Sequence, residues 1–510
     1  MVRKQTRWAA LALCAATMTA GVSAAEAQVA ATAPDGGPSL VNPGPKASPA
    51  QKARYRANRA RRRTIREARS AAGANSAAAS SIVQGVTASA PSLPPGALDL
   101  GNGITMLLNY TGEFAANPSG GRRQGSDYAG QVFFGLDADL GRLAGIDGGS
   151  VHTIVTQRHG RSLAQDYIGN TTSVQEIYGG GQTAHLSLLS YEQKLFDNRL
   201  DIEAGRLLAS VNFLGSPLYC NFQNNEVCGN PKGAFKMTNI TWWPIATWGA
   251  HAKAWVTDKV FVHAGIYEVN PRDQQDNQNG IDWSTRGATG VVVPIEAGYS
   301  TNFGNDPLPR NYSVGAIIDQ SDYTDPVQDV RRGAYLLSGL DPLTRFGRSA
   351  VFARFDQMVW RPDPTGIQGL SLFGVAMAAT GGRQFEDYFF NGGAVLTGTF
   401  AGRPYDTLGV SFAVEHFSPI GLANIRAARA KVGLGYGGVS STQSILELSY
   451  GIQLTPAVRL MPNLQYVINP QLQERYFAQP KRVPDAFVVG AKLSVDLFTL
   501  AGFAKGPGSL

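Results

Sequence analysis

The feature that most constrains this chain is an alternation of apolar and polar residues with a period of two, which recurs from about residue 103 onwards. In residues 446–454, for example, Leu446 and Leu448 fall on one face and Glu447 on the other. This period predicts β-strands that have one apolar and one polar face. No run of eighteen apolar residues occurs in the sequence, so a membrane-spanning helix is not expected.

Three properties favour a transmembrane antiparallel β-barrel over a soluble sheet. Most of the alternating segments are about ten residues or longer, which is the length that crosses a bilayer at a tilt. Their polar faces carry charges and glycines, as a water-filled interior requires. The links between them are alternately short and long. We predict sixteen strands, near residues 103–114, 127–137, 150–159, 183–195, 199–209, 248–257, 260–270, 291–300, 311–321, 349–360, 369–380, 387–400, 406–418, 443–454, 457–469 and 485–498.

The pattern of links predicts the orientation of the barrel. Tight links follow the fourth, sixth and fourteenth strands, at 197–198, 258–259 and 455–456, and long links follow the third, fifth, ninth and thirteenth strands. An even strand number with both ends in the periplasm places the tight links in the periplasm and the long loops outside. Sixteen strands enclose an aqueous channel.

The residues before the barrel predict export. Residues 1–27 have a basic start, a short apolar core and a small-residue site near Ala27, which together predict a cleaved signal peptide. Residues 28–95 are predicted to be a disordered arm with one basic helical segment, carrying a formal charge of +8. The total of +7, less +2 for the signal and +8 for the arm, leaves −3 for residues 96–510. The basic pI therefore gives no argument for nucleic acid binding. We favour a solvated linker over an arm that binds peptidoglycan.

Two cysteines remain after the signal, Cys220 and Cys228. Because an exported protein meets an oxidising periplasm, we predict a disulfide between them, with two free thiols as the alternative. A metal site is disfavoured, since His251 is the only histidine within about thirty residues of the pair.

From residue 107 to residue 498 the sequence resembles the carbohydrate-selective (OprB-type) outer-membrane porins. The most specific stretches are SVQEIYGGGQT (173–183), LSYEQKLFDNRLDIEAGR (189–206) and SPLYCNFQNNEVCGNP (216–231). Further blocks follow the family order, at 109–114, 126–140, 295–304, 356–362, 369–374, 402–410, 446–456 and 462–470.

The resemblance implies a porin domain over residues 96–498, followed by a tail over 499–510. It implies facilitated diffusion of monosaccharides, and of disaccharides as a further expectation, into the periplasm without a cofactor. Partners would be membrane lipid, lipopolysaccharide and the barrel assembly machinery, and the barrel would be a monomer or a homotrimer. Two departures stand out: residues 96–103 (GALDLGNG) lack the short W-G-containing helical segment common in the family, and twelve residues follow Phe498.

A sugar pore needs a polar constriction and aromatic faces for pyranose rings. We expect the loop 210–247 to fold inward and the loop 160–182 to contribute; the alternative for the first is a loop that only packs over the rim. Alternation places Glu203, Glu296, Arg354, Asp356, Glu415, Glu447, Arg459 and Lys492 on the inner wall, and mixed signs favour neutral sugars. Strict alternation places Arg206 on the apolar face. The predicted constriction residues are Arg161, Glu176, Tyr178, Glu203, Arg206, Tyr219, Trp242, Trp243, Arg354, Asp356, Glu447 and Arg459.

Other functions are open to test. A general pore, or one that prefers sugar acids and other anions, differs from a neutral-sugar pore in its ion selectivity. An envelope tether would use the basic arm and keep the barrel as an anchor. An outer-membrane enzyme is disfavoured, because neither G-x-S-x-G nor H-E-x-x-H occurs.

Overall fold

The computed structural model describes residues 96–275, 278–363, 366–431, 433, 439–470 and 482–504. The predicted signal peptide, the basic arm and the last residues of the tail lie outside this part of the chain. Residues 61–338 and 342–510 form the larger of two compact units, and this larger unit holds every described strand. Among the described residues, no helix is long and apolar enough to cross a membrane.

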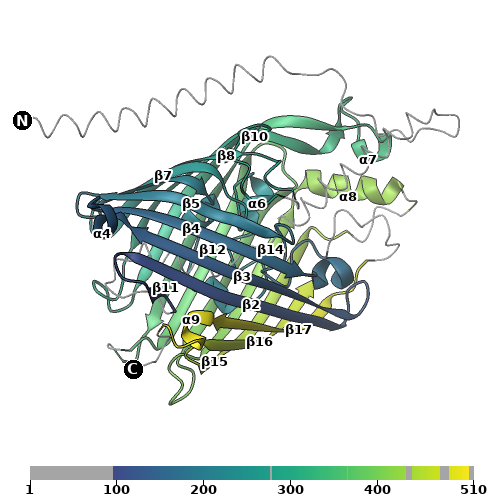
Figure 1. Cartoon of the computed structure of the whole chain (residues 1–510). Coiled ribbons are helices and arrows are strands. Elements are labelled where there is room, and N and C mark those ends of the chain that lie inside the picture. The colour runs from purple at the N-terminus through teal and green to yellow at the C-terminus, as the bar shows by residue number, and fades with distance from the viewer. Residues whose placement is uncertain are drawn as a thin grey trace, which may run out of the picture. The chain divides into compact units, whose positions relative to one another are not determined.

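The larger unit is built around one antiparallel sheet (Figure 1). A two-residue strand, β1 (Leu98–Asp99), pairs with the beginning of β2. The sixteen long strands are β2 (Ile104–Ser119), β3 (Gly125–Asp139), β4 (Gly149–Gly160), β5 (Ala184–Leu195), β6 (Leu200–Leu207), β7 (Thr247–Trp255), β8 (Val260–Val269), β9 (Gly290–Ser300), β10 (Arg310–Asp329), β11 (Pro342–Trp360), β12 (Gly369–Gly381), β13 (Glu386–Thr397), β14 (Thr407–Phe417), β15 (Thr442–Thr455), β16 (Val458–Ile468) and β17 (Ala486–Asp496).

The sheet closes on itself. Each strand from β2 to β17 pairs with the next in sequence, and β17 pairs with β2 in the register Lys492↔Glu113. Closure leaves no free sheet edge, so the backbone polar groups are satisfied within the wall. The predicted sixteen-stranded antiparallel barrel is therefore confirmed.

Several strand boundaries differ from the prediction, and the structure gives the cause of three of them. Strands β10 and β11 continue beyond the predicted limits, to Asp329 and from Pro342, because the pairing resumes after a bulge with Asp322↔Phe346. The last strand ends at Asp496 instead of residue 498, since the Asp496 side chain accepts a hydrogen bond from the Thr499 backbone and caps the short helix α9 (Leu497–Leu500). Phe498 is thus a helical residue.

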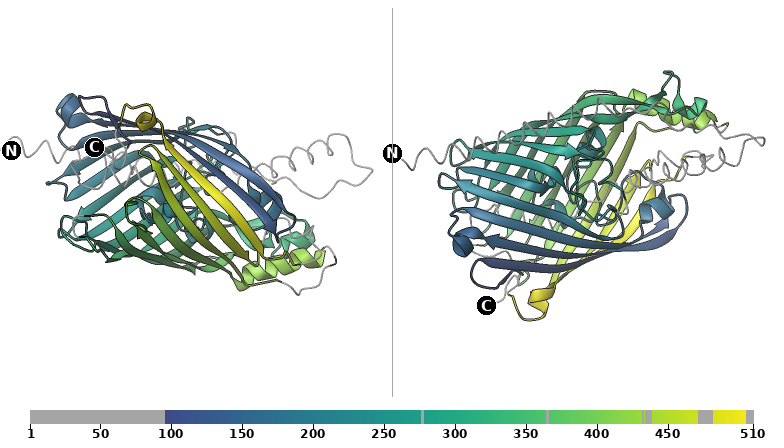
Figure 2. Two further views of the ribbon diagram at one scale, coloured as in Figure 1. Left: turned by 90° about the horizontal axis from the view of Figure 1, so that it is seen from below. Right: turned by 45° about the horizontal axis from the view of Figure 1, so that its top comes forward.

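The two ends of the barrel differ in the length of their links (Figure 2). One end, called here the turn end, carries links such as 196–199, 256–259 and 456–457, together with α9 and α4 (Leu140–Ala144). Asp197 and Asn198 turn the chain there with φ values of 56° and 64°, a conformation that Asp and Asn tolerate. The other end, the loop end, carries 161–183, 208–246, 270–289 and 418–441, the last including α8 (Pro419–Lys431). The short and long links that the sequence predicted lie at these two ends, although the loop end also carries two short links, at 120–124 and 382–385.

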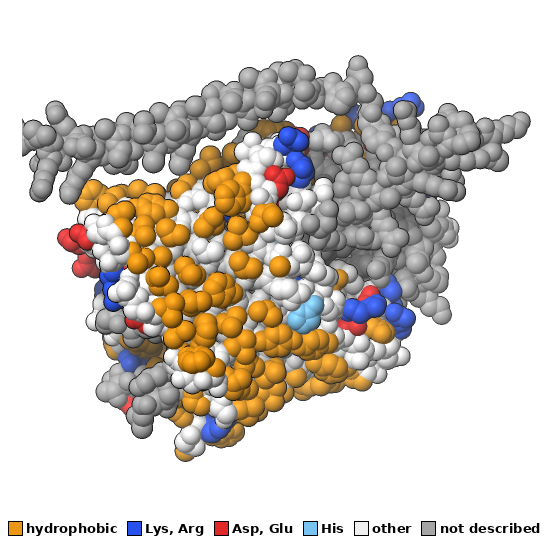
Figure 3. Space-filling view, in the orientation of Figure 1, with side chains coloured by type: hydrophobic (Ala, Val, Ile, Leu, Met, Phe, Trp, Pro, Cys, Tyr) orange, Lys and Arg blue, Asp and Glu red, His pale blue; other side chains and the backbone are white. Residues whose placement is uncertain are grey.

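The outer surface is a band of apolar side chains (Figure 3). On β15, Leu446 and Leu448 are 46% and 45% exposed, while Glu447 and Ser449, which alternate with them, are each 2% exposed. The same alternation follows on β16, where Leu464 and Tyr466 face outward and Asn463 and Gln465 inward. The band is the surface that a bilayer covers.

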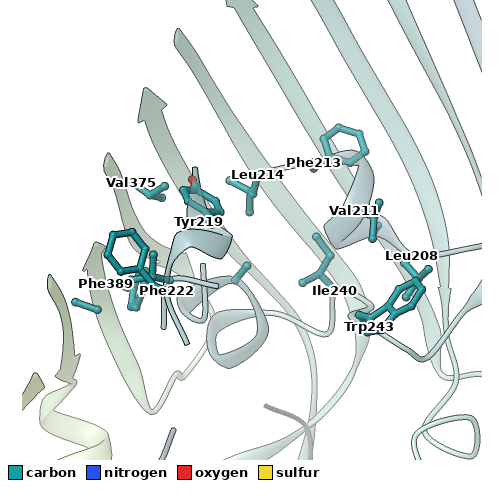
Figure 4. Close-up of a cluster of buried hydrophobic side chains, with 14 of the residues drawn as sticks. Leu208, Val211, Phe213, Leu214, Tyr219, Phe222, Ile240, Trp243, Val375 and Phe389 are labelled. Carbon is teal, nitrogen blue, oxygen red and sulfur yellow. The ribbon is translucent and has the colours of Figure 1, made fainter. Parts of the chain in front are cut away.

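The interior differs from the simple polar lumen that the alternation predicts. At mid-height the inner wall carries large apolar side chains, among them Phe133, Ile317, Phe352, Phe373 and Phe389, all of them buried. They pack with residues of the link between β6 and β7 in one apolar cluster (Figure 4). The inner wall therefore provides an apolar seat for a loop as well as a polar lining.

Replacing Leu448 by Arg should lower the free energy of unfolding in phospholipid vesicles by about 2–4 kcal/mol, because a guanidinium at mid-bilayer loses its hydration. The matched variant Leu454→Arg, on the same face of β15 but near its turn end, should cost about 1 kcal/mol or less. Denaturant titrations followed by tryptophan fluorescence measure both. Equal losses would contradict the placement of Leu448 at mid-bilayer depth.

Candidate functional site

The link of residues 208–246, called here the constriction loop, crosses the inside of the barrel. It leaves β6 after Leu207, carries α5 (Ala209–Asn212), η2 (Tyr219–Asn221) and α6 (Gly233–Met237), and returns to β7 at Thr247. Most of its side chains are buried, including Phe213, Tyr219, Phe222 and Trp243. In Figure 4, Tyr219 and Phe222 lie beside Val375 and Phe389 of the wall, whereas Phe213 and Trp243 lie at the other side of the loop. The expectation that this loop folds inward is confirmed over the alternative of a loop that packs over the rim.

A carboxylate on β15 holds the middle of the constriction loop. Glu447 accepts hydrogen bonds from the Gln223 backbone (2.7 Å), the Asn224 backbone (2.8 Å) and the Asn224 amide (2.6 Å). The next strand adds a contact from Asn463 to Gln223, at 2.7 Å. Three hydrogen bonds from two successive loop residues to one buried carboxyl group fix where the loop lies.

A glycine makes room for the loop on the neighbouring strand. A Cβ added to Gly409 of β14 would lie 2.9 Å from the nearest ring carbon of Phe222 and 2.7 Å from the hydroxyl of Ser449. Any larger residue would push Phe222 off the wall. The wall is therefore shaped for this loop at the level of single side chains.

A second anchor joins α6 to β13 and β14. The Lys236 ammonium bonds Glu415 and lies 3.1 Å from Glu386. Nearby in the constriction loop, burial raises the pKa of Glu226 well above its usual range. Burial also lowers the pKa of Lys232 to about 7. These two groups lie outside the strands, in a cluster that holds both signs of charge, and the cluster ties the loop to the wall.

The other side of the constriction loop is fixed to β9, β10 and β11. The Asn239 backbone donates to Asp319 at 2.8 Å, and Arg348 reaches the Asn239 side chain at 2.7 Å. Arg354 bonds the Gly215 carbonyl and pairs with Glu296 at 3.0 Å. The loop thus has anchors around much of the inner wall, on β9–β11 as well as on β13–β16.

The link of residues 161–183, called here the companion loop, also turns inward. Its Ser173 carbonyl accepts from the Asn225 backbone of the constriction loop at 2.9 Å, and its Val174 carbonyl accepts from Gln465 at 3.0 Å. Lys492 of β17 lies 3.6 Å from Glu176 and 3.1 Å from Glu113. The two inward loops therefore form one unit, as the sequence prediction of two contributing loops expected.

Arg158 of β4 belongs to this site and was not among the predicted residues. It is 1% exposed and donates to Gln131 and to the Gly179 carbonyl of the companion loop, both at 2.8 Å. The alternation in 150–159 could have found it, because Arg158 shares its face with His152, Ile154 and Thr156.

The predicted constriction residues fall into three groups. Those on the inner wall are Glu203, Arg354, Asp356, Glu447 and Arg459. Those on the inward loops are Glu176, Tyr178, Tyr219, Trp242 and Trp243. Two lie elsewhere: Arg161 is at the loop-end rim, paired with Asp166 at 2.7 Å, and Arg206 is on the outer face of β6.

The aromatic part of the sugar prediction needs correction. Tyr219 and Trp243 are each 1% exposed, and Trp242 is 4% exposed, because their rings form the apolar underside of the constriction loop. These rings are buried beneath the surface of the loop, so they present no face to a solute. Tyr178, which is partly exposed, is the predicted aromatic residue that could meet one.

The two cysteines lie at the ends of the segment that Glu447 holds. Their Sγ atoms are 2.9 Å apart and are not bonded to each other. Cys228 is buried and its Sγ is 3.4 Å from the Lys492 ammonium, while Cys220 is partly exposed. The side chains are thus adjacent, and the disulfide itself stays a prediction.

Comparison with known proteins decides the family of this barrel. The profile described as "Carbohydrate-selective porin, OprB family" matches residues 123–497. The chain belongs to the OprB family of carbohydrate-selective porins. With its closed barrel, it is an outer-membrane porin for carbohydrates, and porins of this family are channels and not enzymes.

Individual relatives agree with this placement. Porin B of Pseudomonas aeruginosa is 29% identical over 407 residues, covering 77% of this chain and 87% of its own. The putative porin QuiX of Acinetobacter baylyi is 26% identical over 424 residues, covering 77% and 89%. The high-pH structure of Pseudomonas putida OprB superposes with a TM-score of 0.69 at 28% identity, covering 78% of this porin and 94% of that chain.

Replacing Glu447 by Ala should release the middle of the constriction loop, because three hydrogen bonds to one carboxylate are lost. We expect a loss of about 3 kcal/mol in local stability, which corresponds to about a hundredfold faster amide hydrogen exchange at Gln223 and Asn224. Exchange measured by mass spectrometry in micelles checks this. Gln453→Ala, further along the same strand, is the control, and equal exchange in both variants would contradict the anchor.

Proposed function

We propose that this porin passes small neutral carbohydrates, monosaccharides before disaccharides, through the passage that the constriction loop and the companion loop leave open. The observation that carries the proposal is the constriction loop itself, anchored on β9–β11 and on β13–β16. A loop held in this way limits the size of a solute without any covalent chemistry. The proposed direction is from the loop end, outside, to the turn end in the periplasm.

The charges around the passage support a neutral solute. Glu296 pairs with Arg354 at 3.0 Å, Asp319 with Arg348 at 2.8 Å, and Glu192 with Lys194 at 2.5 Å. Because each of these six charges has a partner of opposite sign, the pairs offer hydrogen-bond donors and acceptors without a strong field of one sign. Selection among ions, by contrast, uses rings of a single charge.

Conductance tests the proposal. The mature porin in a planar bilayer should give a stable channel whose current falls saturably as glucose is added, and a disaccharide should enter vesicles more slowly than glucose does. A current that sugar leaves unchanged would make this a general diffusion pore. A reversal potential displaced strongly toward the anion would favour the sugar-acid alternative, and folded protein without conductance would favour an envelope tether.

We also propose that Cys220 and Cys228 form a disulfide in the exported porin, since their Sγ atoms are already adjacent. Porin unfolded under non-reducing conditions with iodoacetamide should then take up no alkyl group, and should take up two after reduction. Removal of the disulfide in Cys220→Ala/Cys228→Ala should lower stability by about 2–4 kcal/mol. Two alkyl groups before reduction would contradict the disulfide.

A further inference from the structure

Arg206 is a charged residue on the face of the barrel that lipid covers. In the register of β6 it lies opposite Leu189 on one side and Trp248 on the other, and both neighbours point outward. Glu268 of β8 is likewise on the outer face, because Phe261, His263 and Tyr267 occupy the inner one. The free energy cost of a bare guanidinium in hydrocarbon is several kcal/mol, so this position needs a local explanation.

The loop 270–289 supplies a cover over Arg206. It bends over the outside of the wall, where its Asn279 carbonyl accepts from the Leu186 backbone and its Trp283 carbonyl accepts from the Trp248 indole, both at 2.9 Å. Beneath it, one terminal nitrogen of Arg206 donates to the Ala246 carbonyl at 2.6 Å and to Asp273 at 3.2 Å. Arg206 is 1% exposed as a result.

The cover leaves part of the guanidinium unsatisfied. The Nε and the second terminal nitrogen of Arg206 make no hydrogen bond to any described residue, although both are fully buried. The nearest oxygen of Glu268 lies 3.9 Å away and makes none either. Buried N–H groups without an acceptor are costly and uncommon in native structures. Arg206 also lines an open groove, so a molecule bound there can supply the missing acceptor once the guanidinium turns toward it.

The groove lies directly below the loop on the outer face. Its volume is about 270 Å³, and its lining is mostly apolar: Val151, Leu189, Tyr191, Ala204, Trp248 and Trp283, together with Ser190 and Arg206. The small Ala204 forms the floor between larger side chains. The groove runs into the apolar outer band, so its natural contents are those of the bilayer.

We infer that this groove is a lipid-binding site, in which one acyl chain of a membrane lipid fills the apolar part and its ester carbonyl accepts hydrogen bonds from Arg206. An ester carbonyl fits better than a phosphate, because Glu268 and Asp273 already supply two carboxylates to one guanidinium. A neutral acceptor satisfies the free N–H groups without adding a third negative charge. The site is separate from the passage for sugar, since it faces the opposite side of the wall.

Native mass spectrometry of the full mature porin in detergent tests the inference. The probe is dilauroyl phosphatidylethanolamine, compared with its diether analogue, which has the same head and chain length but no carbonyl. We expect one ester lipid to remain bound per barrel after the micelle is stripped, and the diether lipid to bind at least about tenfold more weakly, as the loss of a hydrogen bond to a charged group implies.

Matched variants separate the groove from the rest of the outer band. Ala204→Trp, which fills the floor, should reduce retention of the ester lipid at least about tenfold, whereas Ala353→Trp, another outward-facing alanine on β11, should leave it unchanged. Heat-modifiable migration on gels confirms that each variant is folded. Equal lipid retention in the two variants, or equal binding of the ester and ether lipids, would overturn the inference. A dimer that covers this face and holds no lipid would overturn it as well.

Discussion

The structure depends on one constraint, which is that a backbone in lipid must satisfy its own hydrogen bonds. Pairing of β17 with β2 meets this constraint by removing both edges of the sheet. Once the ring is closed, each strand has an outer face that must be apolar and an inner face that is free to vary. The alternation along β15 and the loops inside the ring both follow from that division.

The inner face uses its freedom in two ways. Charged and amide side chains such as Glu447 and Asn463 hold the constriction loop by its backbone, while Phe373 and Phe389 give the same loop an apolar seat. With a polar lining alone the channel would stay wide, and with an apolar lining alone packed side chains would fill it. The combination positions a rigid partition inside a tube, which is what selection by solute size requires.

The sequence predicted the periodic features of the structure and missed features that have no period. A period of two was enough to find sixteen strands and the face of eight inward charges, because strand geometry is regular, although it was not followed far enough to include Arg158. It missed the extension of β10 and β11, where a bulge restarts the pairing. It also assigned Trp243 and Tyr219 to the solute, since nothing in the sequence says which surface of a loop its rings cover. Arg206 shows the reverse case: alternation placed it outward correctly, and only the three-dimensional course of the loop 270–289 explains how it is tolerated there.

The constriction loop follows β6 in the chain, yet its binding partners are on β13, β14, β15 and β16, which come later in the sequence. Its seat therefore does not exist until the second half of the sheet has formed. The seam between β17 and β2 is a different contact, so closing the ring and seating the loop are separate requirements. Assembly of this barrel consequently includes a packing step as well as a pairing step, and the seam cannot be the only checkpoint for a correctly built pore.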